Sequence, residues 1–149
     1  MGGKFIKVQV QTSDGGHVDA QAWRFDPVGE HDFEIVGESH FQAQLWSLVG
    51  STAAADERMP HEAVAVLLPV SDNPYDANAV EVHIDGMKVG HLSRDDAADL
   101  RADIEELSET NGTAISMIVC NAAIFGGYVT KDGGRAMLGV KLDLELPLV

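Results

Sequence analysis

The feature of this chain that most constrains its fold is an alternation of apolar and polar side chains that tight-turn sequences interrupt. Residues 5–11 alternate before the turn sequence SDGG at 13–16, and residues 78–84 alternate before the pair Asp85–Gly86. A period of two places successive side chains on opposite faces of an extended strand. Asp-Gly and related pairs between two such runs are strong signals for a β-hairpin. The sequence therefore predicts two β-hairpins, one near the N-terminus and one in the middle of the chain.

Further apolar runs predict additional short strands, and two other segments have the period of an α-helix. The additional strands cover residues 33–37, 61–70, 113–125 and 136–146. Apolar residues recur every three or four positions from Phe41 to Val49 and again over 94–107, which is the spacing of one helix face. Gly50 is placed to end the first helix, and Ser93 is placed to cap the second. Many short strands with two helices favour a small β-barrel or curled sheet over a doubly wound fold.

Chain length and the distribution of turn formers indicate one main domain with an N-terminal addition. A chain of 149 residues has the size of a single domain. The segment DPVGEHD at 26–32 is rich in residues that favour turns and linkers. We therefore predict that residues 1–32 form a β-hairpin extension with its linker and that residues 33–149 form the domain.

Cysteine content and hydropathy indicate the cellular compartment in which the protein is expected. Cys120 is the only cysteine, so an intramolecular disulfide is impossible and a cysteine-based zinc site is disfavoured. The sequence has no apolar run near the ~20 residues that span a bilayer, and it has no recognisable signal peptide. We expect a cytoplasmic protein without a membrane partner.

The net charge restricts the partners of the chain. Asp and Glu number 24 against 10 Lys and Arg, which gives a net charge of −14. Such a chain is repelled at long range by nucleic acid, anionic membranes and acidic substrates. Strong non-specific binding to duplex DNA is therefore disfavoured, and nucleic acid could bind only at a local basic or aromatic pocket.

Motifs for catalysis are absent from the sequence. It contains no P-loop, no nucleophile elbow and no HExxH motif, so we expect neither enzymatic activity nor a cofactor. His83, Asp85 and His91 lie on facing strands of the predicted central hairpin, which leaves a metal-dependent enzyme as an alternative. A half-exposed polar strand face explains the same residues, and we favour it. The acidic segment 94–109 is interpreted as a solvated helix face.

An aromatic residue in the turn DNPYD at 72–76 requires an explanation, because turns are usually built from Asn, Asp, Gly and Pro. The ring of Tyr75 could lie down on the barrel and seal a corner, or it could stack on a nucleobase. The Asp76 carboxylate can accept a hydrogen bond from a sugar hydroxyl but repels phosphate. Together with Phe41 and Arg94, this set would suit the end of a nucleic-acid strand, where a free hydroxyl exists.

Four segments, in this order and spacing, resemble a HIRAN domain. They are FEIVGESHFQ at 33–42, DNPYDANAVEVHIDGMKVGHLSRDDA at 72–97, CNAAIFGG at 120–127 and LGVKLDLEL at 138–146. The pattern NPYDxNA followed by VGHL is the specific part. The resemblance implies an OB-like β-barrel with two helices that captures the 3′ end of single-stranded DNA. It also implies that Tyr75 and Asp76 hold the terminal nucleotide and its 3′-hydroxyl.

The same resemblance extends to other residues and also shows departures. It implies that Arg94 and His91 contact phosphate, that Phe41 and His40 occupy a segment which is Arg-Tyr-Tyr in the family, and that Phe125 closes the pocket. Ser39 lacks the cation of that segment, so we expect weak, salt-sensitive binding. The chain has no helicase motor, which leaves recognition or recruitment, with a DNA-processing protein as a further partner. The alternative function is a non-enzymatic protein-interaction or structural module with a vestigial pocket.

Overall fold

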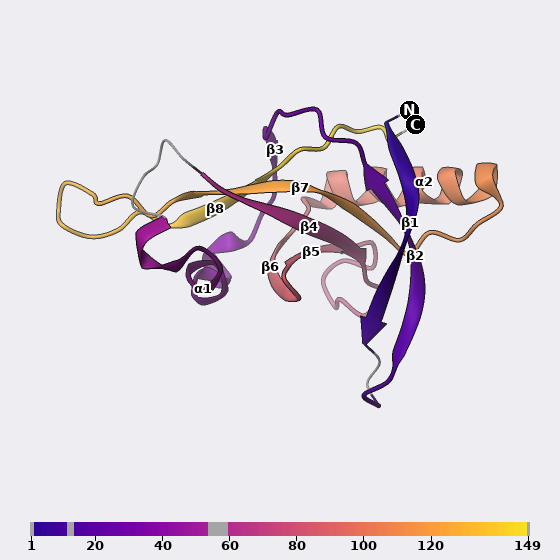
Figure 1. Ribbon diagram of the computed structural model, residues 1–149, viewed down its shortest axis with the longest axis horizontal. Coiled ribbons are helices and arrows are strands. Elements are labelled where there is room, and N and C mark those ends of the chain that lie inside the picture. The colour runs from indigo at the N-terminus through magenta and orange to yellow at the C-terminus, as the bar shows by residue number, and fades with distance from the viewer. Residues whose placement is uncertain (1, 12–13, 54–59, 149) are drawn as a thin grey trace.

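The computed structural model describes residues 2–11, 14–53 and 60–148. Its strands are β1 (Gly3–Gln11), β2 (His17–Phe25), β3 (Phe33–Glu34), β4 (His61–Pro69), β5 (Val80–Ile84), β6 (Met87–His91), β7 (Met117–Gly126) and β8 (Leu138–Leu142). Its helices are the short 3-10 helix η1 (Glu38–His40) and the α-helices α1 (Gln42–Ala53) and α2 (Arg94–Asn111). The expected mostly β class with two α-helices is confirmed. In Figure 1 the β1–β2 hairpin projects away from the other elements.

The strands form one mixed sheet in the order β1-β2-β7-β4-β5-β6, with β8 paired to both β7 and β3. The β2–β7 pair is parallel, and the other recorded pairs are antiparallel. The strand ladders leave the sheet open between β3 and β6. Across this opening, Val36 and His91 exchange backbone hydrogen bonds of 2.8 and 2.9 Å. The curled sheet fits a small OB-like domain, and this link places the chain after β3 against the end of β6.

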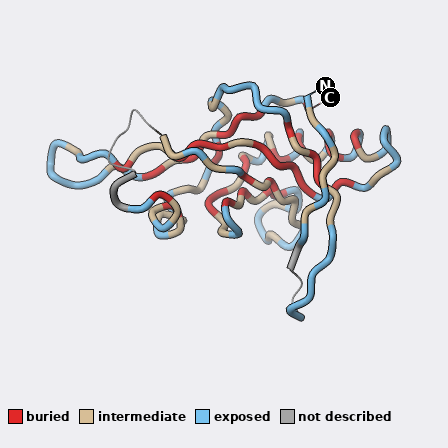
Figure 2. Tube along the Cα trace, viewed as in Figure 1, coloured by how far each residue is buried: buried red, intermediate tan, exposed pale blue. Residues whose placement is uncertain are grey.

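The main hydrophobic core lies between the curled sheet and the two helices. Leu45 of α1 and Leu100 of α2 are fully buried together with Leu67 of β4 and Val82 of β5. Figure 2 shows the buried residues concentrated along the crossing strands, whereas the hairpin tip and the loop beyond β7 are exposed. The helices therefore fix the sheet from its inner side and leave the alternate side chains of β5 and β6 facing outward.

Local signals in the sequence set the helix ends that the structure shows. Ser93 caps α2, and its hydroxyl accepts a 3.2 Å hydrogen bond from the backbone N–H of Asp96. Gly112, with φ of 64°, ends the helix in the left-handed conformation that glycine tolerates. Gly50 also has non-helical backbone angles, with φ of 71°, so the regular part of the first helix ends there, as predicted. A further helical turn follows to Ala53.

Two predicted strands are shorter than their apolar patterns. The first ends at Glu34 because Gly37, with φ of 84°, turns the chain into η1. The last ends at Leu142. Its continuation leaves the ladder where the buried Asp143 carboxylate accepts the backbone N–H groups of Val28 and Gly29 at 2.9 and 2.8 Å. A buried carboxylate is unfavourable without hydrogen-bond donors. The hydrogen bonds of Asp143 therefore end the regular strand, although the alternating sequence pattern continues.

The N-terminal hairpin joins the sheet through a non-local pairing. Residues 22–24 of β2 run parallel to residues 117–119 of β7. The rings of Phe5 and Trp23 pack edge to face, with centroids 5.0 Å apart. The predicted hairpin is thus present, although residues 12 and 13 of its turn lie outside the described part. The helices of the described residues include none that is long and apolar enough to cross a membrane.

Candidate nucleic-acid interface

The loop between β4 and β5 is ordered by its own polar side chains. The Asn73 side-chain oxygen accepts hydrogen bonds from the backbone N–H groups of Tyr75 at 2.8 Å and Asp76 at 3.1 Å. The Asp76 carboxylate accepts a 2.9 Å hydrogen bond from the N–H of Asn78. Asn and Asp stabilise turns through this type of side chain to backbone bond. The turn therefore holds Tyr75 and Asp76 in a defined orientation without using either side chain for core packing.

The Tyr75 side chain is free of the core. It is 86% exposed, which excludes the interpretation of a ring sealed against the barrel. Arg94, at the first position of α2, donates a 2.8 Å hydrogen bond from Nη2 to the Tyr75 carbonyl oxygen. The structure thus brings together a projecting aromatic ring, the neighbouring Asp76 carboxylate and an exposed guanidinium.

A second arginine of α2 holds the base of the same loop. Arg101 donates to the backbone carbonyls of Asn78 at 2.8 Å and Ala79 at 3.1 Å, and also to the carbonyl of Val70. One side chain therefore ties together the two ends of the loop that carries Tyr75. Sequence reasoning did not assign this role to Arg101, because its partners are more than 20 positions away and are backbone atoms.

A second group of predicted residues gathers where η1 meets β6. The rings of Phe41 and His91 lie with centroids 6.3 Å apart and planes tilted by 49°. Lys88 places its Nζ 5.8 Å from the centroid of the Phe41 ring, within range of a cation–π interaction. Gly90 permits the chain after β3 to approach β6 closely, because a Cβ at Gly90 would come within 2.7 Å of the Val36 carbonyl oxygen.

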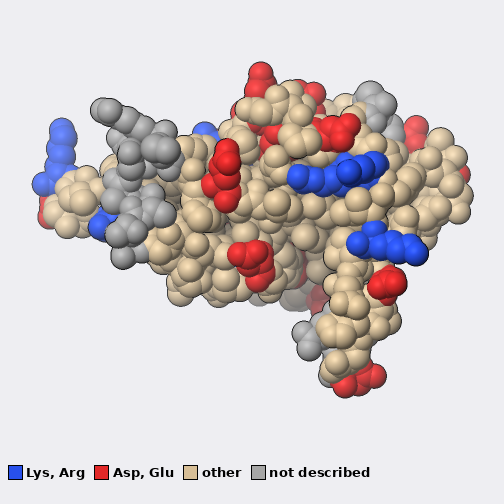
Figure 3. Space-filling model, viewed as in Figure 1, with Lys and Arg blue, Asp and Glu red and all other residues tan. Residues whose placement is uncertain are grey.

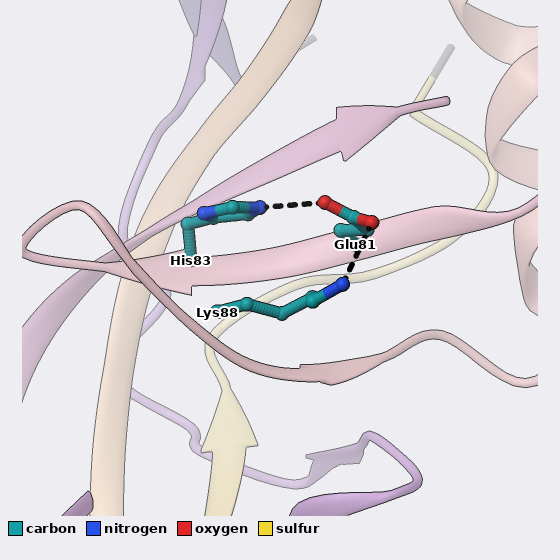
Figure 4. Close-up of polar contacts among 3 residues, drawn as sticks. All are labelled: Glu81, His83 and Lys88. Atoms are coloured by element: carbon teal, nitrogen blue, oxygen red, sulfur yellow. Dashed lines mark hydrogen bonds and ion pairs between the residues drawn. The ribbon is translucent and has the colours of Figure 1, made fainter. Parts of the chain in front are cut away.

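The outward side chains of β5 and β6 form a small polar cluster (Figure 4). Glu81 Oε1 lies 2.9 Å from His83 Nε2, and Glu81 Oε2 accepts a 3.1 Å hydrogen bond from Lys88 Nζ. His91 is paired across the strands with Glu81, and His83 with Lys88. The four side chains therefore share one face of the hairpin, because directly opposed residues on antiparallel strands point to the same side.

Burial and charge shift two pKa values in this cluster. Partial burial raises the pKa of Glu81, but the hydrogen bonds and positive charges of His83 and Lys88 outweigh it, so the pKa is lowered overall. Burial also lowers the pKa of His91, and the Lys88 charge adds to this effect against the opposing pull of Glu81. His91 is consequently a neutral imidazole at neutral pH, able to donate one hydrogen bond but supplying little positive charge.

The acidic helix lies on the other side of the β5–β6 hairpin from this cluster. The buried side chains of β5 belong to the same core as Leu100 and Ile104 of α2. Glu81 and His83 alternate with those buried positions, so they point away from the helix. The face drawn in Figure 3 likewise carries separate acidic and basic side chains with broad uncharged areas between them. The net charge is therefore unevenly distributed over the molecule.

The remaining predicted residues are His40 and Phe125. His40 is exposed at the end of η1, next to Phe41 in the chain. Phe125 lies on β7, where Lys141 Nζ is 5.5 Å from its ring centroid. It lines a separate cavity of about 280 Å³ with Glu34 and Glu38 among other residues. The participation of His40 and Phe125 in one pocket with Tyr75 stays a prediction.

The alternative of a metal-dependent enzyme finds no geometric support in the described residues. Asp85 occupies the hairpin turn with φ of 51°, and His83 contacts Glu81 instead. Within residues 2–11, 14–53 and 60–148, no group of three His, Cys, Asp or Glu side chains is arranged to hold a metal ion. Cys120 is buried, and burial raises the pKa of its thiol to about 12, so the thiol is unreactive.

Comparison with protein families matches this geometry to a known domain. The family model described as HIRAN domain matches residues 28–122, which is more than half of the chain. The chain belongs to the HIRAN domain family. Membership in this family implies DNA binding. The matched residues include Tyr75, Asp76, His91 and Arg94, so the groups described above fall within the HIRAN domain. A search of curated proteins and a search of solved structures gave no match.

The structure adds residues to this HIRAN domain that sequence reasoning did not select. Lys88 and Glu81 were passed over because nothing in the sequence shows that they meet each other or Phe41. The period-two pattern was the only available signal, since it places both residues at outward positions of the central hairpin. Their pairing requires the actual register, which a bulge shifts between Val82 and His83.

Proposed function

We propose that this HIRAN protein binds the 3′-hydroxyl end of single-stranded DNA without enzymatic turnover, in a DNA repair or replication context. The observation that carries the proposal is the projecting ring of Tyr75, 86% exposed on a turn that other groups hold in place. A ring that projects from an ordered turn offers its faces to a stacking partner. Base stacking on such a ring contributes about 1–3 kcal/mol per base.

Each residue has a role that follows from its chemistry. Tyr75 stacks on the terminal base, and Asp76 accepts a hydrogen bond from the 3′-hydroxyl. Arg94, whose guanidinium is exposed apart from its bond to the Tyr75 carbonyl, pairs with a backbone phosphate. Phe41 supplies a second ring, and the neutral His91 beside it donates a hydrogen bond to a phosphate oxygen.

The distribution of charge supports a weak interaction. Few basic side chains face the loop that carries Tyr75 and the β5–β6 hairpin, while the chain as a whole has a net charge of −14. Affinity then rests on a small number of phosphate contacts and falls with salt. This surface fits recognition of a strand end through its hydroxyl and its base. It fits binding along a length of phosphate backbone less well.

The decisive experiment compares two oligonucleotides that differ only at the 3′ end. Fluorescence anisotropy at low salt should show tighter binding of the 3′-hydroxyl form than of the 3′-phosphate form, because the Asp76 carboxylate repels a terminal phosphate. Asp76→Asn should reduce this preference, since an amide does not carry the repelling charge. Equal binding of the two oligonucleotides to the unmodified protein would remove the claim of end recognition.

A protein partner from DNA processing is a second proposal, supported by the same negative net charge of −14. If the chain acts as an interaction module, a partner captured by the intact protein should still be captured by the double variant Tyr75→Ala, Asp76→Ala. Loss of capture in that variant would tie the partner to the DNA-binding surface instead.

A further inference from the structure

The Glu81 carboxylate is bound as an internal anion on the outer face of the β5–β6 hairpin. Its two oxygens face different donors, with His83 Nε2 at 2.9 Å and Lys88 Nζ at 3.1 Å. The side chain of Glu81 is 17% exposed, against 24% for His83 and 38% for Lys88. The two donors are thus more accessible to a ligand than the acceptor between them (Figure 4).

This cluster adjoins the aromatic part of the proposed DNA site. Lys88 Nζ lies 5.8 Å from the Phe41 ring centroid, and Glu81 is directly opposite His91 in the strand pair. A nucleotide whose base stacks on Phe41 carries its backbone phosphate only one sugar away from that base. The Lys88 ammonium is then a cation in position to meet it, on the side away from the acidic helix α2.

We propose that Lys88 and His83 form a phosphate subsite of the DNA interface, and that Glu81 occupies this subsite until a backbone phosphodiester displaces it. The inference rests on the proposed function and adds a ligand group to it. An oxyanion of the DNA takes the place of the carboxylate between the same two nitrogen donors. Charge-assisted hydrogen bonds from Lys and His to phosphate are among the stronger polar contacts in proteins.

The groups around His83 define the charge that this subsite accepts. They are Glu81 on its own strand and Lys88 and His91 on β6. Strand β4 places the apolar Val66 opposite His83. When a phosphodiester oxygen takes the place of the Glu81 carboxylate, one singly charged anion replaces another between the two donors, so the charge between them is conserved.

The test measures anisotropy of a short labelled deoxyoligonucleotide with a free 3′-hydroxyl at low salt. Lys88→Ala is expected to weaken binding about three- to tenfold, the effect of losing one charge-assisted contact. Glu81→Ala, which empties the subsite of its internal anion, is expected to tighten binding about two- to fivefold. Glu81→Gln gives the same sign with nearly unchanged side-chain volume, should the alanine variant fail to fold. His83→Ala is expected to weaken binding about two- to tenfold, because one hydrogen bond to the phosphate is lost.

Matched controls separate this subsite from a general effect of charge. Lys131→Ala removes a lysine that is exposed in the loop between β7 and β8, and Glu106→Ala removes an exposed carboxylate from α2. Both should change affinity by less than about twofold. If Lys88→Ala and Glu81→Ala behave like these controls while the 3′-hydroxyl preference persists, the subsite is refuted and the proposed function stands. If the intact protein binds neither oligonucleotide end, the proposed function and the subsite fall together.

Discussion

The two sides of the β5–β6 hairpin carry very different electrostatic environments. On the inner side, α2 carries seven acidic side chains. Most of them are exposed, while the buried Asp103 accepts the backbone N–H of Leu148 at 2.9 Å. On the outer side, Glu81 is held between Lys88 and His83. The difference shows that a net charge of −14 does not determine the field at a particular face.

Solvent screening explains why the two sides can differ. Interactions between exposed charges fade over about 8–10 Å at moderate salt, so hydrated carboxylates on α2 act weakly across the sheet. Contacts on the outer face are shorter and partly buried, and they are screened less. Arg94 and Arg101 connect the acidic helix to the loop that presents Tyr75, because each donates hydrogen bonds from α2 to backbone carbonyls of that loop.

The largest expected effect comes from removing the connection made by Arg101. Arg101→Ala should lower the free energy of unfolding by about 2 kcal/mol, because hydrogen bonds from a charged donor to three carbonyls are lost at once. It should also weaken DNA binding by freeing the Tyr75 loop. Urea unfolding and anisotropy measure the two effects. For the unfolding measurement alone, Arg94→Ala is the matched control, since it removes a single carbonyl contact and should leave stability nearly unchanged.

Removing the exposed ring should affect binding without affecting stability. Tyr75→Ala is expected to weaken binding of the 3′-hydroxyl oligonucleotide about tenfold, or about 1.4 kcal/mol, through loss of stacking. The melting temperature should not change, because the ring has no core contacts to lose. Tyr128→Ala, at the other exposed tyrosine, is the control and should bind normally. A drop in melting temperature for Tyr75→Ala would contradict the assignment of a free ring.

The salt dependence of binding should report how many phosphates are contacted. Arg94→Ala is expected to make the slope of log affinity against log salt shallower by about 0.7, the value for one contact to a single strand. Anisotropy at several salt concentrations gives the slope. An unchanged slope would mean that Arg94 serves only the Tyr75 carbonyl.

Acid should destabilise the outer cluster in two steps. The pKa of His91 is lowered from 6.5 in the folded protein, so stability falls as the pH drops below that value. The pKa of Glu81 is lowered from 4.5, so its contribution is complete above that value and is lost as the pH falls toward its folded pKa. Denaturant unfolding should be measured across this pH range. His91→Gln should lose less free energy of unfolding in the step at higher pH, and Glu81→Gln should lose less in the step at lower pH. Profiles identical to that of the unmodified protein would exclude both linkages.

The smallest effect is expected on the acidic side. Glu106→Gln should change oligonucleotide affinity by less than about twofold at moderate salt, because the exposed Glu106 carboxylate lies about 18 Å along α2 from Arg94 and its charge is screened. Anisotropy measured in parallel on Tyr75→Ala gives the loss of affinity with which this change is compared. A tightening as large as the loss in that variant would show that α2 repels the DNA directly, and the distinction between the two sides would be lost.

Local rules account for most of the elements that the sequence predicted. Alternation located both hairpins, Ser93 marked the start of α2, and Gly50 and Gly112 marked helix ends. The turn residues around Tyr75 were recognisable because Asn and Asp stabilise turns through their own side chains. These features depend on neighbours within a few positions, which a single sequence displays.

Non-local contacts account for what the sequence did not reveal. The parallel pairing of β2 with β7 and the link between Val36 and His91 join segments far apart in the chain. The contacts of Lys88 with Glu81 and with Phe41 depend on a bulge and on the position of η1. Hydrophobic period and strand propensity carry no register information across such distances. Glu81 and Lys88 of the polar cluster could therefore be found only in the folded protein.

The most direct test of the central claim is a map of backbone amide chemical shifts during titration with a short 3′-hydroxyl deoxyoligonucleotide. We expect shifts confined to the loop around Tyr75, the start of α2 at Arg94, the outer face of β5–β6 and the residues near Phe41, with the turns of α2 beyond Arg101 unchanged. Shifts that concentrate on α2 or on the β1–β2 hairpin and spare the Tyr75 loop would contradict the central claim.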